Sequence, residues 1–368
     1  MRSSCFAQNP ACVRLHIGKH QRGSLPRSIA WEWAAAQAIQ EITAMPHKKA
    51  KPAARQPSPG FEQRQGSLRS LSTPPPAVSG RWLLAAVSIT LVAAAACAWC
   101  TLCLLFWQGS WQLLYHPSIT VARTPASIGL AFDPVGFAST EAGEPRLKGW
   151  WIPASQGSRF SRYTVLYLHG QDGNLANALD ALAALHAVGV NVLAFDYRGY
   201  GQSQFARPSE AHWRQDAEWA LRYLTGTRHV APGSILLDGN NLGANLALEI
   251  AADHPELGGV VLRQPLNAPA DAIFSDPRAR LVPARLLVRD RFDLTAAASR
   301  LRIPSLWLME TPPQVQAGLP KSPDAFQRVT APRILVQLTD LRSAETDSEN
   351  ALSRWLDDLP NPERTPPN

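Results

Sequence analysis

The sequence has no cysteine after Cys103 and no histidine after His254. Without thiols, the chain beyond residue 103 can form neither a disulfide nor a thiolate centre, whatever compartment it occupies. Without a late histidine, the segments that follow residue 254 contribute no imidazole to a catalytic or metal site. The C-terminal part of the chain therefore offers neither a thiol nor an imidazole for chemistry.

Clustered basic charge is scarce outside the N-terminal region. Residues 1–81 hold 12 Lys/Arg against 3 Asp/Glu, whereas the remainder holds 24 against 26. Because non-specific nucleic-acid binding rests on clustered Lys and Arg, we expect no nucleic acid among the partners of the folded region. Frequent prolines interrupt any periodicity before residue 81, so we predict a disordered, basic and Pro-rich tail over residues 1–81. Met45 is an alternative start, and the sequence leaves open whether residues 1–44 are made.

Charged residues are absent between Trp82 and Trp107. This stretch exceeds the roughly 20 residues that cross a bilayer, and tryptophans at its ends suit the two membrane interfaces. Seven basic residues between positions 48 and 81 precede it, and within the next thirty or so residues only Arg123 follows. The positive-inside rule then predicts a transmembrane helix over residues 82–107, with a cytoplasmic N-terminus and an extracytoplasmic C-terminal domain.

Two alternatives to this membrane anchor stay open. A cleavable signal peptide is less favoured, because the apolar stretch is longer than the about 7–15 residues of such a segment. The other alternative is a buried helix of a soluble domain. Cys97, Cys100 and Cys103 have the spacing of a metal or redox motif, but they lie inside the apolar stretch. We interpret them as small apolar residues of a membrane helix, with palmitoylation as a minor alternative.

From about residue 112 the pattern becomes α/β. An opening hairpin is expected at 135–139 and 147–152, and apolar runs then alternate with helical stretches. We expect strands at 165–168, 190–195, 235–237, 259–262, 305–308 and 334–338, and helices at 174–187, 209–225, 242–253 and 348–358. Short apolar strands separated by amphipathic helices predict a mainly parallel sheet with helices on both faces. We therefore assign residues 112–368 to one α/β domain.

One motif in this domain has the spacing of a hydrolase nucleophile elbow. Residues 239–243 read Gly-Asn-Asn-Leu-Gly, which matches Gly-x-Ser-x-Gly between an apolar strand and a helix. The central residue is Asn241, and a carboxamide has no hydroxyl or thiol with which to attack a substrate. The motif therefore supports a fold but lacks the usual nucleophile.

Further segments carry the pattern of a known family. They are Leu114–Pro117, Leu147–Pro153, Tyr167–Asn174, Phe195–Ser203, Arg291–Asp293 and Ile303–Pro304. Together with the elbow, they resemble the α/β-hydrolase superfamily, and most closely its membrane-anchored, prolyl-peptidase-like serine hydrolases. The resemblance covers about residues 112–310 well and residues 310–368 poorly. It implies an α/β-hydrolase fold, preceded here by one transmembrane helix, and a triad in the order Ser, Asp/Glu, His.

The resemblance also shows where the triad departs from the family. The catalytic acid is expected after the strand that ends near Met309, where Pro313 stands at the aspartate position. The histidine is expected after the strand that ends near Leu338, in a segment whose fitting position is Asp340. Glu310 supplies a carboxylate, but no imidazole is present for it to orient. With Asn241, these three coordinated departures predict a degenerate triad without serine-hydrolase chemistry.

A binding site is expected to survive at the elbow. The resemblance implies an oxyanion loop that starts at His169, and the N–H groups of Gln171 and Leu242 are expected to point at one spot above a helix N-terminus. Such a cradle suits a carbonyl or carboxylate that is held without being cleaved. Our candidate ligand-binding residues are His169, Gly170, Gln171, Asp172, Asn240, Asn241 and Leu242. We interpret His169 and Asp196 as structural, and Asp172 as a solvated loop residue or, alternatively, as a pocket-lining one.

These observations favour a membrane-anchored pseudohydrolase that acts as a binding or scaffold protein, with a small molecule or peptide as ligand. The alternative is an active hydrolase that cleaves an ester, thioester or peptide through an unrecognised arrangement. No cofactor or metal is expected, because His212, His229 and His254 show no ligand-like spacing. The sequence leaves the oligomeric state, the ligand and the partner open.

Overall fold

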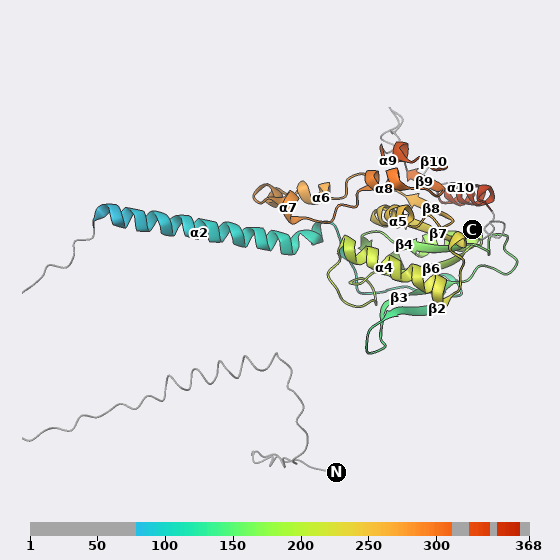
Figure 1. Cartoon of the computed structure of the whole chain (residues 1–368). Helices are drawn as coiled ribbons and strands as arrows, with labels where there is room; N and C mark the ends of the chain where they lie inside the picture. The colour runs from blue at the N-terminus through green and yellow to red at the C-terminus, as the bar shows by residue number, and fades with distance from the viewer. Residues whose placement is uncertain (1–78, 311–323, 339–343, 361–368) are drawn as a thin grey trace, which may run out of the picture. The chain divides into compact units, whose positions relative to one another are not determined.

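A computed structural model describes residues 79–310, 324–338 and 344–360. Within these ranges a sheet of eight strands runs in the order β10-β9-β8-β7-β4-β6-β3-β2 (Figure 1). Its strands are β2 (Asp133–Ser139), β3 (Pro145–Ile152), β4 (Thr164–Leu168), β6 (Asn191–Asp196), β7 (Ile235–Asn240), β8 (Gly259–Arg263), β9 (Ser305–Glu310) and β10 (Arg333–Leu338). All pairs from β10 to β6 are parallel, whereas β3 is antiparallel to both β2 and β6. The opening hairpin and the mainly parallel sheet that the sequence predicts are confirmed.

Helices cover both faces of this sheet, as expected (Figure 1). On one face, α3 (Leu179–Val188) packs against α10 (Ala344–Asp358), and both contribute to one of two apolar clusters. On the other face lie α4 (Glu210–Arg222), α5 (Leu242–Asp253), α8 (Leu294–Arg300) and α9 (Asp324–Arg328). Alternate residues of a strand point to opposite faces, so within β4 Val165 packs with the first cluster and Leu166 with the second.

Several elements differ from the expected ones at their ends. The helix expected at 174–187 starts with a 3₁₀ turn, Leu175–Asn177, because the Asn174 side chain accepts the Ala176 N–H at 2.9 Å. The helix expected at 209–225 ends at Arg222 and continues as a π-helical turn, Tyr223–Thr227. The short helices α6 (Asp271–Phe274), α7 (Ala284–Leu287), α8 and α9 were not predicted, because they are too short for a hydrophobic period to register.

A long apolar helix, α2 (Gly80–Gly109), precedes the domain. Ser79 caps its start by accepting the Trp82 N–H at 3.3 Å. Among the described residues this is the one helix long and apolar enough to cross a membrane, and most of its side chains are exposed. Length and composition are weak evidence, so the transmembrane helix and its orientation stay predictions. The tail expected over residues 1–81 lies almost entirely outside the described residues.

The C-terminal end of α2 is joined directly to the domain. Phe106 is buried in the same apolar cluster as α4 and α5, and Leu102, Cys103 and Trp111 pack against that cluster. After a 3₁₀ turn, Ser110–Leu113, the chain forms a two-residue parallel ladder between β1 (His116–Pro117) and β5 (Asp172–Gly173). This ladder ties the exit of the long helix to the loop that follows β4.

Candidate functional site

Asn241 lies at the tip of the sharp turn between β7 and α5. Its backbone has φ 51° and ψ −119°, a strained combination that residues other than glycine rarely adopt. The Asn241 N–H donates to the Arg263 carbonyl at 2.9 Å, and its own carbonyl accepts the Ala244 N–H at 3.0 Å. The strand–turn–helix geometry that the motif predicts is therefore present, with a carboxamide where a nucleophile would stand.

Two glycines make this turn sterically feasible. A Cβ atom on Gly239 would lie 2.3 Å from the Gly243 carbonyl oxygen. One on Gly243 would lie 2.2 Å from the Leu168 carbonyl oxygen and 2.4 Å from that of His169. No side chain fits at either position, so the first turn of α5 sits directly against the carboxyl end of β4. This close approach is what brings the loop after β4 to the elbow.

The first N–H of α5 is occupied by a side chain from that loop. Leu242 donates to Oε1 of Gln171 at 3.3 Å. The opening N–H groups of a helix have no partner within the helix, so the Gln171 carboxamide satisfies a donor that would otherwise be open. Gly170 lies beside it, since a Cβ there would be 3.4 Å from the Asn241 Cβ. Gln171, Asn241 and Leu242 are thus close together, as predicted. The Leu242 N–H, which we expected to be free for a ligand, instead donates to the Gln171 side chain.

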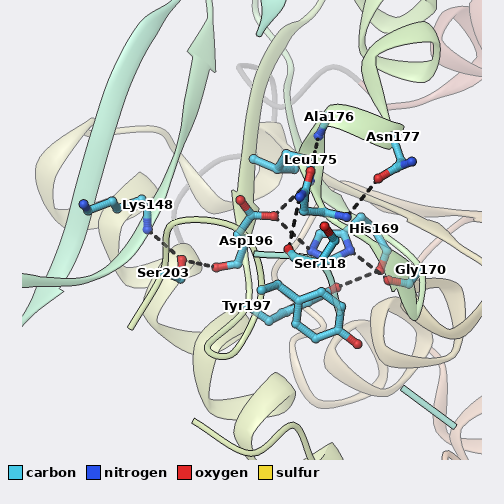
Figure 2. A network of polar contacts seen from close by, with 12 residues as sticks. Ser118, Lys148, His169, Gly170, Leu175, Ala176, Asn177, Asp196, Tyr197 and Ser203 are labelled. Atoms are coloured by element: carbon cyan, nitrogen blue, oxygen red, sulfur yellow. Dashed lines mark hydrogen bonds and ion pairs between the residues drawn. The ribbon is translucent and has the colours of Figure 1, made fainter. Parts of the chain in front are cut away.

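His169 lies beneath the loop instead of facing outward (Figure 2). It is 3% exposed, and its ring packs against Tyr197 and Tyr200 with centroid distances of 4.4 and 5.2 Å. Its Nδ1 lies 2.8 Å from the Gly170 carbonyl and must carry the proton of that hydrogen bond. Burial lowers the pKa of His169 to about 4, so the ring is neutral at pH 7. These contacts agree with a structural role, and ligand binding by His169 stays a prediction.

Asp196 joins the end of β6 to the same loop (Figure 2). Its Oδ1 accepts the Leu175 N–H at 2.9 Å, and its carbonyl accepts the Ser203 hydroxyl at 2.5 Å. Burial raises the pKa of Asp196 to about 7, and backbone hydrogen bonds from Leu175 and Gln202 oppose the rise. The His169 Nε2 is 3.7 Å from Oδ1, but because that ring is neutral the contact is not an ion pair. The position agrees with the structural turn acid that we predicted.

Asp172 extends away from this network toward solvent. Its Oδ1 lies 2.7 Å from Nδ1 of His116, and both side chains are more than half exposed. Their residues are paired in the β1–β5 ladder, so the contact closes the edge of the loop after β4. This placement fits the solvated reading of Asp172, and its ligand-binding role stays a prediction.

A cavity of about 320 Å³ opens where β7, β8, β9 and β10 end. Of the seven predicted binding residues, Asn240 lines it. The other lining residues come from the strand ends and from α3 and α10: Asp180, Ala181, Ala184, Arg263, Gln264, Leu308, Glu310, Leu338 and Ser348. Ligands of open parallel sheets bind outside the carboxyl ends of the strands, which is where this cavity lies.

A buried ion pair organises one wall of the cavity. Arg263 donates from Nε to Asp238 at 2.8 Å, from Nη2 to the same carboxylate at 2.8 Å, and from Nη1 to the Ser348 hydroxyl at 2.7 Å. Burial raises the pKa of Asp238 and the arginine opposes that rise. Sequence reasoning missed Arg263, Gln264 and Ser348. The available signal was that Arg263 and Gln264 directly follow the strand predicted at 259–262. Nothing in the local sequence connects Ser348 to them.

Other predicted positions cannot be placed. Pro313 and Asp340, which stand where the family carries its acid and histidine, lie outside the described residues. Within the described ranges, no group of three or more His, Cys, Asp or Glu side chains is arranged to hold a metal ion.

Comparison with known proteins shows a family match across the domain. The model of a family described as serine aminopeptidase, S33, matches residues 160–353, just over half of the chain. An uncharacterized protein of Mycobacterium tuberculosis, Rv2307c, is 34% identical over 168 residues, which cover 46% of this chain and 58% of that protein. The uncharacterized protein YfhR of Escherichia coli is 32% identical over 106 residues, 28% of this chain and 37% of the relative. The chain thus matches less than two thirds of either relative's length.

Solved structures are also similar to this chain, at low sequence identity. The esterase Pf2001 of Pyrococcus furiosus is 18% identical, with a TM-score of 0.48 over 67% of this chain and 97% of that one. An α/β hydrolase from Vibrio vulnificus is 22% identical, with a TM-score of 0.47 over 63% of this chain and 81% of that one.

Proposed function

The chain belongs to the serine aminopeptidase S33 family of α/β hydrolases, and from that membership and its altered elbow we propose that it is a membrane-anchored member that binds a ligand without cleaving it. The observation that carries the proposal is the elbow itself, where Asn241 stands at the tip of the turn and the next N–H, that of Leu242, donates to the Gln171 side chain. A family enzyme needs a nucleophile at the tip of the turn and free donors for the developing oxyanion. Here the tip is a carboxamide, and the Leu242 N–H is held by Gln171.

The described histidines do not supply a general base at the elbow. His169 is neutral, buried and hydrogen-bonded to Gly170. His116 pairs with Asp172, and His254 lies between Glu218 and Glu256 on the surface. His186 lies beside the Ser155 hydroxyl and His212 beside the Arg207 carbonyl. None of these five rings is hydrogen-bonded to the elbow, so we expect a hydroxyl introduced there to have no imidazole that takes its proton.

The cavity at the strand ends gives the proposal its ligand class. Its volume of about 320 Å³ lies at the small end of the range for ligand sites, about 300–1,000 Å³. Asn240 and Gln264 supply carboxamides that can donate to and accept from a carbonyl group. Arg263 is neutralised by Asp238, and the carboxylates of Asp180 and Glu310 also line the cavity, so the wall favours a neutral polar group over an anionic one. A small acyl or peptide-like molecule fits this lining.

An activity probe tests the loss of catalysis. The full chain, purified in detergent, is treated with a fluorophosphonate probe and with p-nitrophenyl acetate. We expect no labelled serine and no turnover above that of a sample denatured beforehand. Labelling of a domain serine by the probe, blocked by prior denaturation, would favour the alternative of an active hydrolase with an unrecognised site.

A binding assay tests the other half of the proposal. Thermal unfolding is followed with N-acetyl-alanine amide and with octanoate as probes, at millimolar concentration. We expect N-acetyl-alanine amide to raise the midpoint in the wild type more than octanoate does, because a ligand that binds the folded state stabilises it and the carboxylates of the cavity repel an anion. Asn240→Asp adds a negative charge to the cavity wall and is expected to weaken octanoate more than the neutral amide. No shift with either probe would count against a small acyl or peptide-like ligand.

The orientation of the anchor is part of the proposal and rests on charge asymmetry around residues 82–107. A reporter that works only outside the cytoplasm, fused to the C-terminus, is expected to be active. Activity seen solely with a cytoplasmic reporter would reverse the orientation and place the cavity in the cytoplasm.

A further inference from the structure

The C-terminal half of α2 lies beside a segment of the domain that connects β8 to α8. The segment runs through α6 and α7, residues 271–291, and we call it the cap segment. Trp99 of α2 donates its indole N–H to the Leu281 carbonyl at 3.1 Å, across 182 residues of sequence. α2 and α7 are in contact along this side (Figure 1). The cap segment is therefore held against the helix that we propose as the anchor.

The contact between α2 and the cap segment also encloses a hollow. A cavity of about 260 Å³ is lined by Leu102, Leu105, Phe106, Gly109, Ser110 and Leu113 of the helix region and by Arg278 of the cap segment. Apart from the hydroxyl and the guanidinium, these side chains are apolar. An apolar hollow that opens beside a membrane helix suits a hydrocarbon chain better than water.

The cap segment exposes large apolar side chains. Leu281 is 62% exposed and Leu286 is 82% exposed. By contrast Val282 and Val288 are buried and anchor the segment to the domain. Two large exposed leucines on one segment give it an apolar surface that suits an apolar partner.

Basic side chains surround these leucines. The cap segment has five arginines against three aspartates, of which Asp276 pairs with Arg278, although beyond residue 81 the chain as a whole is slightly acidic. Each of the five is exposed: Arg278, Arg280, Arg285, Arg289 and Arg291. Apolar side chains ringed by arginines are typical of protein surfaces that lie in the headgroup region of a bilayer.

The position of Trp99 sets the depth of this surface. Trp99 lies ten residues before the end of α2 at Gly109, and at about 1.5 Å per residue this separation is about 15 Å along the helix axis. A helix that crosses the bilayer along residues 82–107 carries Trp99 inside the leaflet next to the domain. Leu281, which contacts Trp99, must then lie below the outermost headgroups of that leaflet.

We propose that the cap segment is a second membrane contact, in which Leu281 and Leu286 enter the leaflet next to the domain and the arginines bind anionic phospholipid headgroups. The proposal rests on α2 being a membrane-spanning helix, as stated under the proposed function. It adds that the domain lies on the bilayer surface instead of being held away from it by the anchor alone. The hollow beside Arg278 then opens to lipid acyl chains.

Spin labels in the full chain test this contact. The five native cysteines are replaced by serine, the protein is reconstituted in nanodiscs with a quarter anionic lipid, and single cysteines are labelled at four sites. Leu281→Cys and Leu286→Cys report on the cap segment, Leu91→Cys on the anchor, and Ile334→Cys on an exposed apolar position of β10. Power saturation then measures collisions with oxygen, which enters lipid, and with a water-soluble nickel complex, which does not.

The collision rates at the four labels test the cap-segment contact separately from the membrane anchor on which it rests. Labels at 91, 281 and 286 should collide with the nickel complex at least about tenfold less than the label at 334, because polar solutes are excluded from hydrocarbon. If 91 is in lipid while 281 and 286 are in water, the membrane contact is wrong and the anchor stands. If all four labels are in water, the anchor fails and the contact with it.

A charge variant tests the role of the arginines. Arg280→Glu combined with Arg285→Glu should raise nickel collisions at the label on residue 286 in anionic nanodiscs several-fold. Arg354→Glu, an exposed arginine of α10, is the matched control and should leave the label unchanged. Equal lipid exposure at residue 286 in anionic and neutral nanodiscs, with and without the double variant, would overturn the headgroup interaction.

Discussion

Restoring a serine at the elbow should give little activity. Asn241→Ser places a hydroxyl on the turn with φ 51° and ψ −119°, a backbone conformation that Asn241, itself not a glycine, already adopts. A typical enzyme turns over at about 10 s⁻¹. General-base assistance is worth about 10²–10⁴ in rate, and no described imidazole contacts the elbow to supply it. One oxyanion donor is worth about 10²–10³, and the Leu242 N–H is held by Gln171.

These two losses place the expected turnover of Asn241→Ser on p-nitrophenyl acetate at about 10⁻³ s⁻¹ or less. Adding Gln171→Gly should free the Leu242 N–H and raise the rate of the single variant by at most about 10²–10³. Asn240→Ser, one residue earlier on β7, is the matched control and should show no gain. Thermal unfolding of each variant checks that the fold is kept.

Turnover near 10 s⁻¹ by Asn241→Ser alone would refute this reasoning, because it requires a general base that the described site does not show. The wild-type protein would then have to be tested again as an enzyme with an unusual nucleophile. A gain in Asn240→Ser equal to that in Asn241→Ser would show that the turnover does not come from the elbow.

Three further predictions concern stability. Burial raises the pKa of Asp196 to about 7, so the folded protein holds a proton that the unfolded chain loses near pH 4, and this contribution to stability falls as pH rises through 7. Urea unfolding at pH 5 and pH 9 should show a smaller fall in stability for Asp196→Asn than for the wild type. An equal fall in both proteins would contradict this prediction. Gly243→Ala should destabilise the folded domain by several kcal/mol or prevent folding, because the new Cβ would lie 2.2 and 2.4 Å from two carbonyl oxygens. Gly226→Ala, with nothing within 4 Å of its Cβ, is the control and should leave the thermal unfolding midpoint nearly unchanged. Asp238→Ala should lower the free energy of unfolding by at most about 3–5 kcal/mol, because it leaves the partly buried Arg263 without its fully buried partner. A loss below about 1 kcal/mol in urea unfolding would show that the pair is hydrated.

Local pattern determined much of the architecture. The alternation of short apolar runs with helical stretches gave the element order, because the periods of strands and helices are properties of neighbouring residues. The elbow was also readable, since Gly239, Asn241 and Gly243 lie within five residues. Helices as short as α6 and α7 were not predictable, because four residues contain too little of a helical period.

Only the tertiary structure decided which side chains contact the elbow and the cavity wall. The Gln171 side chain meets the Leu242 N–H across 71 residues, and Arg263 meets Ser348 across 85. Such contacts depend on which strands become neighbours and on where each side chain points, and neither is encoded in local spacing. The contact of Trp99 with Leu281, across 182 residues, has the same origin. The sequence by itself therefore determined the fold class and the asparagine at the tip of the elbow. Packing between distant segments decided that the Leu242 N–H is occupied and that the cap segment lies beside the long helix.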